Sequence, residues 1–474
     1  MPEMSKLTLN ADRLFPSDPV IRAHARELYE KVKDLPIISP HGHTDPSWFA
    51  NDTPFDNATQ LLVSRDHYVF RMLYSLGVSM QDMGIKTRDG APYETDPRKI
   101  WHIFAKYWYA FRGTPSRGWL EHAFSTVLGV EDRLSPETAD KIYDQINETL
   151  AKPEFRPRAL YERFNIGALS TTDSPLSDLA DHKAIKASGW KGRVVPAFRP
   201  DDVVDPEAYP EFYENLAKLG EVSGEDVYSW KGYLNAFRKR RAYFKENGCT
   251  STDHGHPSAL TADLSEAECE ALFAKITGKT YTHEDAELFR AQILTEMAKM
   301  SIDDGLVMQI HPGACRNHND FVFQRFGRDM GADIPVSMDY THALKPLLNK
   351  FGNDRRLTLI VFTLDETVFS RELAPLAGHY PAMRMGPAWW FLDSPEAMMR
   401  YRETVTETGG FYNTVGFNDD TRAFLSIPAR HDVARRIDCG YLGRLVAEHR
   451  LPMEEAHEVA YALTNGLVKD AYNL

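Results

Sequence analysis

The chain has 474 residues, of which 43% are hydrophobic and 26% are charged, and this is the usage of an ordinary folded protein. Its net charge of −13, from 55 basic and 68 acidic residues, argues against binding along a nucleic-acid backbone. The four cysteines form no Cys-x-x-Cys pair, so neither a disulfide framework nor a thiolate zinc site is expected. The sequence has no signal-peptide pattern and no apolar run of ~18 residues, so we expect a cytoplasmic protein that does not enter a membrane.

The first motif follows a predicted helix and a short apolar strand. A helical spacing of apolar side chains over residues 18–33 leads into the run 37–39, which is too short for a helix. The next residues are His41, Gly42 and His43. In an extended segment the two imidazoles share one face, and the glycine leaves the approach to them open. This pattern suits a metal site, although it also occurs by chance as an ordinary surface or core pair.

A long helical region comes next. Helical patterns recur at 60–76, 97–111 and 136–150, and no convincing strand is present between residues 46 and 163. Connections between a strand and its helix are normally far shorter. We therefore interpret 46–163 as a helical insertion over the mouth of a barrel, with residues 1–45 as the N-terminal helix and first strand and 164–474 as the remainder.

After residue 164 the pattern changes to short strands that alternate with helices, which is typical of a parallel sheet. The predicted strands are 166–170, 193–198, 249–252, 306–310, 357–362, 382–385 and 411–415. Together with the first strand they make eight. The predicted fold is therefore α/β, a (β/α)8 TIM barrel with a large insertion after the first strand.

A barrel active site lies at the carboxyl ends of the strands. Polar residues that follow the predicted strands are His41, His43, Thr172, Asp173, Arg199, Asp253, His254, His311, Asp365, Arg384, Asp420 and Arg422. Each has a local interpretation as well, since Asp253 or Asp365 can cap the following helix and His311 can bond to a turn. Their common position favours one shared site.

The first and last strands are neighbours in a closed barrel, so the residues that follow them can meet at one metal ion. His41, His43 and a carboxylate from residues 418–422 suit a single catalytic Zn²⁺ or a similar divalent ion. His254 or His311 is a candidate additional ligand, although a substrate contact or a structural role is the simpler interpretation of each.

The remaining candidates describe a pocket for a carboxylated small molecule. Arg199, Arg384 and Arg422 can bind a carboxylate through two parallel hydrogen bonds. Trp389 and Trp390 can form an apolar wall against a sugar, or simply pack in the core. In the insertion, His67 and Tyr68 are on a helix that is expected to lie over the metal. There the Tyr68 phenol can exchange a proton if a metal ion or an arginine lowers its pKa. Packing of both side chains in the core is the alternative.

In these residues the chain resembles the uronate isomerase family, also called glucuronate isomerase, of the amidohydrolase superfamily. The resemblance covers nearly the whole chain and is carried, in matching order, by His41-Gly42-His43, Asp66-His67-Tyr68, Thr171-Thr172-Asp173, Phe198-Arg199-Pro200-Asp201, Asp253-His254, His311-Pro312-Gly313-Ala314, Trp389-Trp390-Phe391 and Asp420-Thr421-Arg422. It implies interconversion of D-glucuronate with D-fructuronate, and of D-galacturonate with D-tagaturonate, in bacterial hexuronate catabolism.

The resemblance also implies roles. His41, His43 and Asp420 become the metal ligands, and His67, Tyr68, Arg199 and Arg422 surround the substrate. Asp419 departs from the family pattern, so the choice of Asp420 over Asp419 as ligand rests on the Asp-x-Arg spacing. We expect a hexuronate as substrate and a homo-oligomer as the assembly.

Aldose–ketose isomerisation through a cis-enediol needs a base, an acid and a group that stabilises the developing oxyanion. We assign Asp420 and Tyr68 to proton transfer, with His67 beside them, and leave open which of the pair takes the carbon-bound proton. The main alternative is a metal-dependent amidohydrolase that acts on an acidic amide or ester. It lacks a defensible carboxylated-lysine candidate. A non-catalytic sugar-acid binding protein is a third possibility, and it gives no reason for an acid–base pair.

Overall fold

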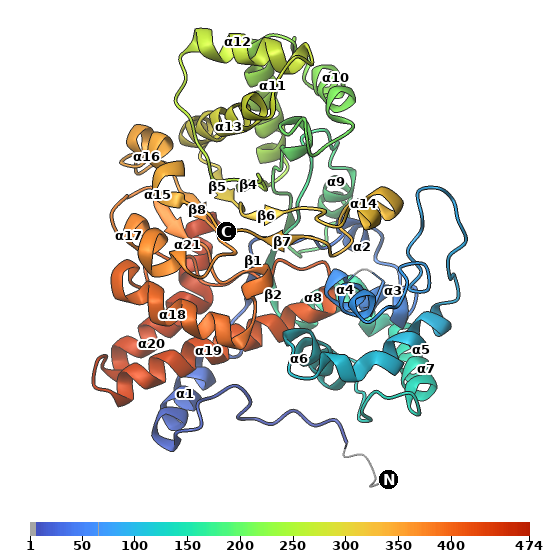
Figure 1. Ribbon diagram of the computed structural model, residues 1–474. Helices are drawn as coiled ribbons and strands as arrows, with labels where there is room; N and C mark the ends of the chain where they lie inside the picture. Colours follow the sequence, from blue (N-terminus) through green and yellow to red (C-terminus); the bar gives the residue numbers. More distant parts are fainter. Residues whose placement is uncertain (1–5, 65) are drawn as a thin grey trace.

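The computed structural model describes residues 6–64 and 66–474, and its short strands lie at the centre of three groups of helices (Figure 1). The strands are β1 Ile37–Ser39, β2 Ile166–Ser170, β3 Val194–Val195, β4 Ser251–His254, β5 Val307–Ile310, β6 Ala314–Cys315, β7 Ile334–Pro335, β8 Leu359–Val361 and β9 Met383–Met385. The fold class is α/β, as the sequence predicts.

Two parallel sheets carry the site. One has the order β1-β2-β3 and the other β4-β5-β8-β9, and every neighbouring pair within them is parallel. A single bridge between Phe198 and Thr252 joins the two sheets, and another between Met385 and Thr414 continues beyond β9. Parallel strands end at the same edge, so the residues after β1, β4 and β5 come together. The antiparallel pair β6–β7 was not predicted.

The predicted strands agree with the structure to different degrees. Residues 166–170 form β2 as predicted, whereas β3 is shortened to two residues and is followed by Pro196, which has no N–H for a strand ladder. The predicted strand 411–415 is reduced to a single parallel bridge from Thr414 to Met385. There the Thr414 N–H donates to the carbonyl of Phe411 at 3.1 Å, which makes a turn between two glycines of left-handed backbone at 410 and 416.

Helices make up most of the remaining structure. The first half of the chain has α1 Pro19–Val32, α2 Pro46–Asn51, α3 Ala58–Leu62, α4 His67–Ser75, α5 Pro97–Tyr107, α6 Pro115–His122, α7 Ala139–Leu150, α8 Pro157–Arg163, α9 Ala180–Ala187, α10 Phe212–Ser223 and α11 Trp230–Glu246. The second half has α12 Glu266–Thr277, α13 His283–Asp304, α14 Asp320–Phe326, α15 Tyr340–Ala343, α16 Lys345–Phe351, α17 Ala374–Ala377, α18 Pro395–Gly409, α19 Ile427–Ala447, α20 Met453–Tyr461 and α21 Leu467–Tyr472. In the described residues, no helix is both long and apolar enough to cross a membrane.

The helices from α2 to α8 form one of the three groups, and no described residue between 46 and 163 is in a strand. The predicted helix 60–76 is divided into α3 and α4, because Asp66 accepts a hydrogen bond from the Tyr68 N–H and starts a new helix. This group shares a buried apolar cluster with β1, β2 and the turn at Phe424. The chain on both sides of β1 is thereby held against the helical group.

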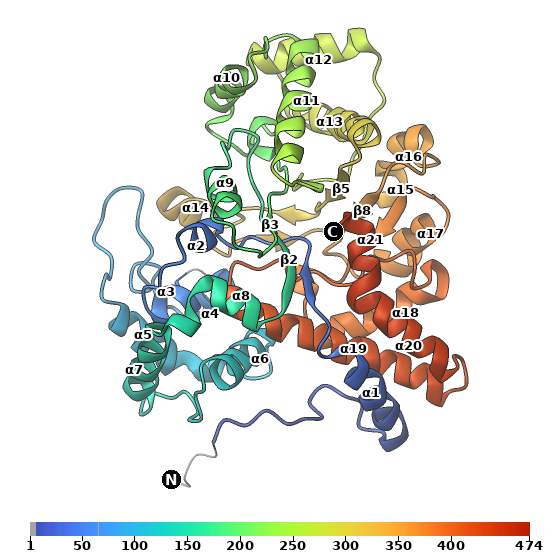
Figure 2. The same ribbon diagram turned by 180° about the vertical axis from the view of Figure 1, so that it is seen from behind.

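The other two groups of helices lie on other sides of the sheets than the group from α2 to α8. Helices α10 to α13 stand over the sheet of β4 and β5, while α1 packs along α19 and α20 at the other end (Figures 1 and 2). Asp18 caps α1, as expected for its sequence, by accepting hydrogen bonds from the N–H groups of Val20 and Ile21. Helix α19 begins just after the segment that carries Asp420, so its packing against α1 and β1 holds that segment near the first strand.

Candidate active site

The two histidines follow β1 directly. His41 is buried, and the Gly42 carbonyl between them accepts a hydrogen bond from the Thr172 hydroxyl at 2.9 Å. The His43 N–H donates to the Thr421 carbonyl at 3.0 Å. Segments that follow β1, β2 and α18 are therefore tied together by main-chain and hydroxyl contacts, which fix both imidazoles against the last turn before α19.

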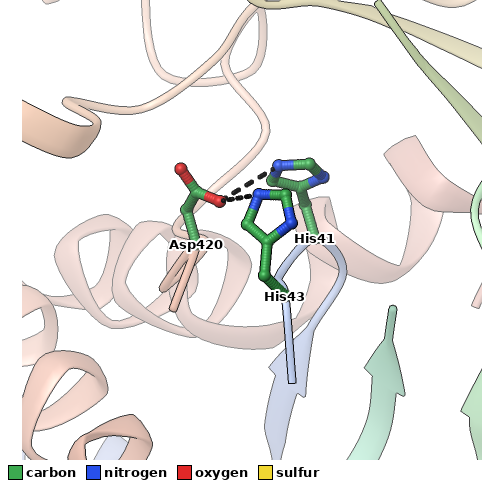
Figure 3. A group of neighbouring side chains, drawn as sticks. All are labelled: His41, His43 and Asp420. Atoms are coloured by element: carbon green, nitrogen blue, oxygen red, sulfur yellow. Dashed lines mark ion pairs between the residues drawn. The ribbon is translucent and has the colours of Figure 1, made fainter. Parts of the chain in front are cut away.

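Asp420 faces both histidines. Its Oδ1 lies 3.2 Å from Nε2 of His41 and 3.1 Å from Nε2 of His43 (Figure 3). Its backbone is left-handed, with φ 39°, and the Trp389 indole N–H donates to its other oxygen. Burial alone would raise the pKa of Asp420, but the two imidazoles hold that pKa well below its ordinary value. The carboxylate is therefore ionised at neutral pH.

The neighbouring carboxylate has a different partner. Asp419 is buried, and its Oδ2 lies 3.0 Å from Nε2 of His431 on α19. Asp420, the acid chosen from the Asp-x-Arg spacing, is therefore the one that meets the two histidines, and Asp419 meets His431 instead.

A second set of groups surrounds His311. Its ring stacks on that of His41 with centroids 4.5 Å apart, and its Nδ1 lies 2.6 Å from Oδ1 of Asp253. The other Asp253 oxygen lies 3.0 Å from Nη1 of Arg199, whose Nε donates to Asp201 at 2.7 Å. Asp253 is fully buried at this junction, so its interpretation as a helix cap is wrong. Burial lowers the pKa of His311 to about 4, which keeps the ring neutral.

These groups line a cavity of about 860 Å³ at the carboxyl ends of the strands. The candidates from the sequence that line it are His41, His43, His67, Tyr68, Arg199, His311, Trp389, Trp390, Asp420 and Arg422. Thr172 lines it too, whereas Asp173, Asp253, Asp365, Arg384 and His254 do not. Arg384 donates to the carbonyls of Pro381 and Met383, and His254 is buried behind the cavity wall with its Nε2 on the Thr252 hydroxyl.

Tyr68 enters the cavity from the start of α4, beside His67, whose ring stacks on it at 4.6 Å. Burial raises the pKa of Tyr68 above its ordinary value, and the charge of Arg430 opposes this without overcoming it. The expected lowering of the pKa is therefore wrong for the protein alone. Burial also lowers the pKa of His67 to about 3. Tyr68 is thus a protonated phenol and His67 a neutral imidazole.

Arg430 is a cavity residue that the sequence did not indicate. It lies in α19, is 1% exposed, and its guanidinium carbon is 3.6 Å from the Trp119 ring and 5.5 Å from the Tyr68 ring. Its Nη1 also donates to Asp393, which is buried. One arginine among many in a long helix carries no sequence signal of this kind. Only the packing of α19 against α4 and α6 places it beside the phenol.

The parallel strands end at two histidines, an ionised aspartate and a cavity lined by arginines. These features define an α/β enzyme with a candidate metal centre. Residues 19–468 match the family described as glucuronate isomerase. The chain belongs to this family and is an isomerase.

The similarity extends over full-length relatives. The chain is 63% identical over 468 residues to a uronate isomerase of Phenylobacterium zucineum, covering 99% of this chain and 97% of the relative. A crystal structure of glucuronate isomerase from Caulobacter crescentus superposes with a TM-score of 0.97 at 60% identity, covering 99% and 97%. That of a uronate isomerase from Thermotoga maritima superposes with 0.91 at 27% identity, covering 98% and 99%.

Proposed function

We propose that this enzyme interconverts D-glucuronate with D-fructuronate, and D-galacturonate with D-tagaturonate, by proton transfer through a cis-enediol. Membership of the family supplies the reaction class. The observation that carries the mechanism is the meeting of an ionised carboxylate, Asp420, and a protonated phenol, Tyr68, in one arginine-lined cavity. Pairs of titratable groups whose pKa values are driven apart mark the acid and the base of an active site.

In the aldose-to-ketose direction, the base removes the proton from C2 while an acid gives a proton to the carbonyl oxygen on C1. The resulting enediol then takes a proton at C1 and loses one from the oxygen on C2. Asp420 is ionised and can accept, whereas Tyr68 is protonated and can donate. We therefore assign the carbon-bound proton to Asp420 and the oxygen-bound proton to Tyr68. The neutral His67 ring beside the phenol is placed to hydrogen-bond a substrate hydroxyl.

The cationic groups suit a sugar acid. Arg199 and Arg422 reach the cavity, and Arg316, Arg328 and Arg430 also line it. Guanidinium groups bind carboxylates with two parallel hydrogen bonds and stabilise an oxyanion as it forms. Trp389 and Trp390 add an apolar wall with ring centroids 5.5 Å apart. A cavity of about 860 Å³ has room for a six-carbon acid.

A divalent metal ion, most simply Zn²⁺, belongs at His41, His43 and Asp420. One nitrogen from each imidazole and one carboxylate oxygen lie within 4.8 Å of one another, and this donor set is that of a catalytic zinc site. Trp389 holds the second Asp420 oxygen, so that Oδ1 remains turned to the histidines. His41, His43 and Asp420 would hold such an ion, which would supply Lewis-acid chemistry toward the substrate when bound.

We further propose that the parallel strands close into the (β/α)8 barrel of metal-dependent hydrolases, with 46–163 as the insertion. The bridge between Phe198 and Thr252, which joins the two sheets, supports closure, and so does the bridge between Met385 and Thr414 beyond β9. The hydrogen bond from the His43 N–H to the Thr421 carbonyl supports it as well. The hydrolase alternative needs a metal-activated water that attacks an acidic amide or ester. An arginine-lined cavity suits an acidic substrate in either case, and family membership favours the isomerase.

The mechanism is tested with D-glucuronate that carries deuterium at C2, incubated with the purified enzyme in ordinary water. We expect a 2-keto product in which part or all of the label is lost to solvent, because a carboxylate shares its proton with water between the two transfers. Mass spectrometry of the product at low conversion measures the loss. Full retention of deuterium at C1 would instead indicate a hydride shift, and hydrolysis of an amide without uronate turnover would favour the hydrolase.

Arg422→Met is expected to lower kcat/KM by about 30- to 1,000-fold, which corresponds to ~2–4 kcal/mol of transition-state binding. Arg422 is half-exposed and its contact with Asp329 is 3.4 Å, so its loss leaves no buried charge unpaired. The fold should survive, which makes it a cleaner test than Arg199 with its buried carboxylates. Steady-state kinetics measure the effect.

The matched control is Arg384→Met, which removes an arginine of the same rim that does not line the cavity. Its activity should stay near that of the wild type. Full activity in folded Arg422→Met, or an equal loss in Arg384→Met, would remove Arg422 from the substrate site.

A further inference from the structure

Three buried side chains meet at a place that the isomerase mechanism does not use. His254 ends β4, His256 follows it after one glycine, and Asp201 begins the short helix η4, Asp201–Val203. One ligand atom from each lies within 4.8 Å of the other two. The three residues are between 0% and 4% exposed. They share no residue with the His41, His43 and Asp420 centre.

The imidazoles of this cluster have nitrogen atoms that no described residue satisfies. Nε2 of His254 lies 3.1 Å from the Thr252 hydroxyl, which leaves Nδ1 without a partner. Neither nitrogen of His256 has a partner within the described part of the chain. Buried polar atoms are nearly always hydrogen-bonded, so several unsatisfied nitrogens that gather beside one carboxylate point to a ligand.

The carboxylate is held in place for such a role. Both oxygens of Asp201 lie 3.1 Å from the Gly255 N–H, and one accepts from Nε of Arg199 at 2.7 Å. A Cβ at Gly255 would lie 2.8 Å from the Asp201 carboxylate and 2.1 Å from the guanidinium. Only glycine therefore lets this pair sit against the backbone between the two histidines. Fixed outer contacts of this kind orient metal ligands in other proteins.

The surrounding charges favour a cation. Arg199 is bound by two carboxylates, Asp201 and Asp253. Arg290 is likewise bound by Asp205 and Glu207, each at 2.9 Å. Each arginine is thus outweighed by its acidic partners, and the neighbourhood keeps an excess of negative charge. A divalent cation between the two histidines would reduce the repulsion among these carboxylates.

We propose that Asp201, His254 and His256 form a second site for a divalent transition-metal ion, of the class of Zn²⁺. Two imidazoles and one carboxylate are a common zinc donor set, and the ring planes of the two histidines lie at 88° with centroids 5.9 Å apart. Asp201 and His256 line the main cavity, so the ion reaches the site through it. Because Asp201 also holds Arg199, an ion here fixes the position of a guanidinium that faces the substrate.

The site is tested by Zn²⁺ binding to the purified enzyme after treatment with a chelator. The protein is equilibrated with free Zn²⁺ and the bound metal is measured per chain. His256→Asn is expected to bind one ion fewer than the wild type, and so is His41→Ala, while the double variant loses both. The matched control is His182→Ala, since His182 is buried with its Nε2 on the Thr171 hydroxyl and belongs to no metal cluster among the described residues. It should bind as many ions as the wild type.

Crystals of the wild-type enzyme soaked in Zn²⁺ give a second readout that does not depend on how the variants fold. An anomalous peak at the zinc edge is expected among Asp201, His254 and His256, in addition to the peak at His41 and His43. A map without a peak between those three residues overturns the proposal. A second ion that lies instead among His41, Asp253 and His311 overturns it as well, as does unchanged zinc content in folded His256→Asn.

Discussion

Asp420→Asn is expected to lower kcat by at least about 100- to 10,000-fold while the circular dichroism spectrum stays that of the wild type. A lost general base alone has an effect of this size, and an amide cannot accept a proton at neutral pH. The substitution also removes the charge that faces His41 and His43 at 3.2 and 3.1 Å. Turnover of D-glucuronate and metal content, measured on the same samples, check the prediction.

Two variants separate the base from its surroundings. Asp419→Asn removes the adjacent carboxylate, which lies against His431 and not in the cavity lining, and should retain most of the activity. His41→Ala loosens the metal centre but leaves the Asp420 carboxylate, and should keep measurable turnover because isomerisation consumes no metal-activated water. Activity near the wild type in Asp420→Asn would exclude it as the base. Complete loss of turnover in His41→Ala would show that the ion does more than orient the substrate.

Local sequence patterns predicted the parts of the fold that local interactions determine. The capping aspartate of α1 and the apolar run of β2 are examples, because a cap or a buried strand depends on a few consecutive residues. Of the strand predicted at 411–415, only one parallel bridge at Thr414 forms, because the flanking glycines allow a turn that occupies most of the segment. The division between α3 and α4 was missed for a similar reason, since Asp66 can lie on a helix or cap one.

The position of a residue just after a strand predicted that it lies near the site. The sequence did not predict the direction in which its side chain points. His41, His43 and Asp420 meet because the ends of β1 and the segment before α19 are neighbours, which follows from strand order. Arg384 also lies at a strand end, yet its side chain turns to the carbonyls of its own segment. Arg430 shows the converse, since it reaches the cavity from the first turn of a helix, α19, through packing between α19 and α6.

The environment of Tyr68 decides its role in the reaction. The phenol is partly buried in the cavity wall, and its desolvation there raises its pKa although Arg430 lies 5.5 Å from the ring. A group of raised pKa is protonated throughout the neutral range, so it can donate to an oxygen that becomes negative but cannot serve as the resting base. Asp420 has the opposite shift. The two groups therefore enter the reaction with fixed and complementary protonation states.

Tyr68→Phe is expected to lower kcat by about 100- to 10,000-fold with a smaller change in KM, because the lost hydroxyl acts on charge that develops in the transition state. The ring and its contacts with Trp119 and His67 remain, so folding should be unaffected.

Because the raised pKa keeps the phenol protonated, wild-type kcat should also show no decline from Tyr68 ionisation as pH rises toward 10, the ordinary tyrosine value. The matched control is Tyr209→Phe, which removes another phenol of the same cavity that the mechanism does not use. A Tyr68→Phe enzyme within about threefold of the wild type would assign the oxygen-bound proton to another group.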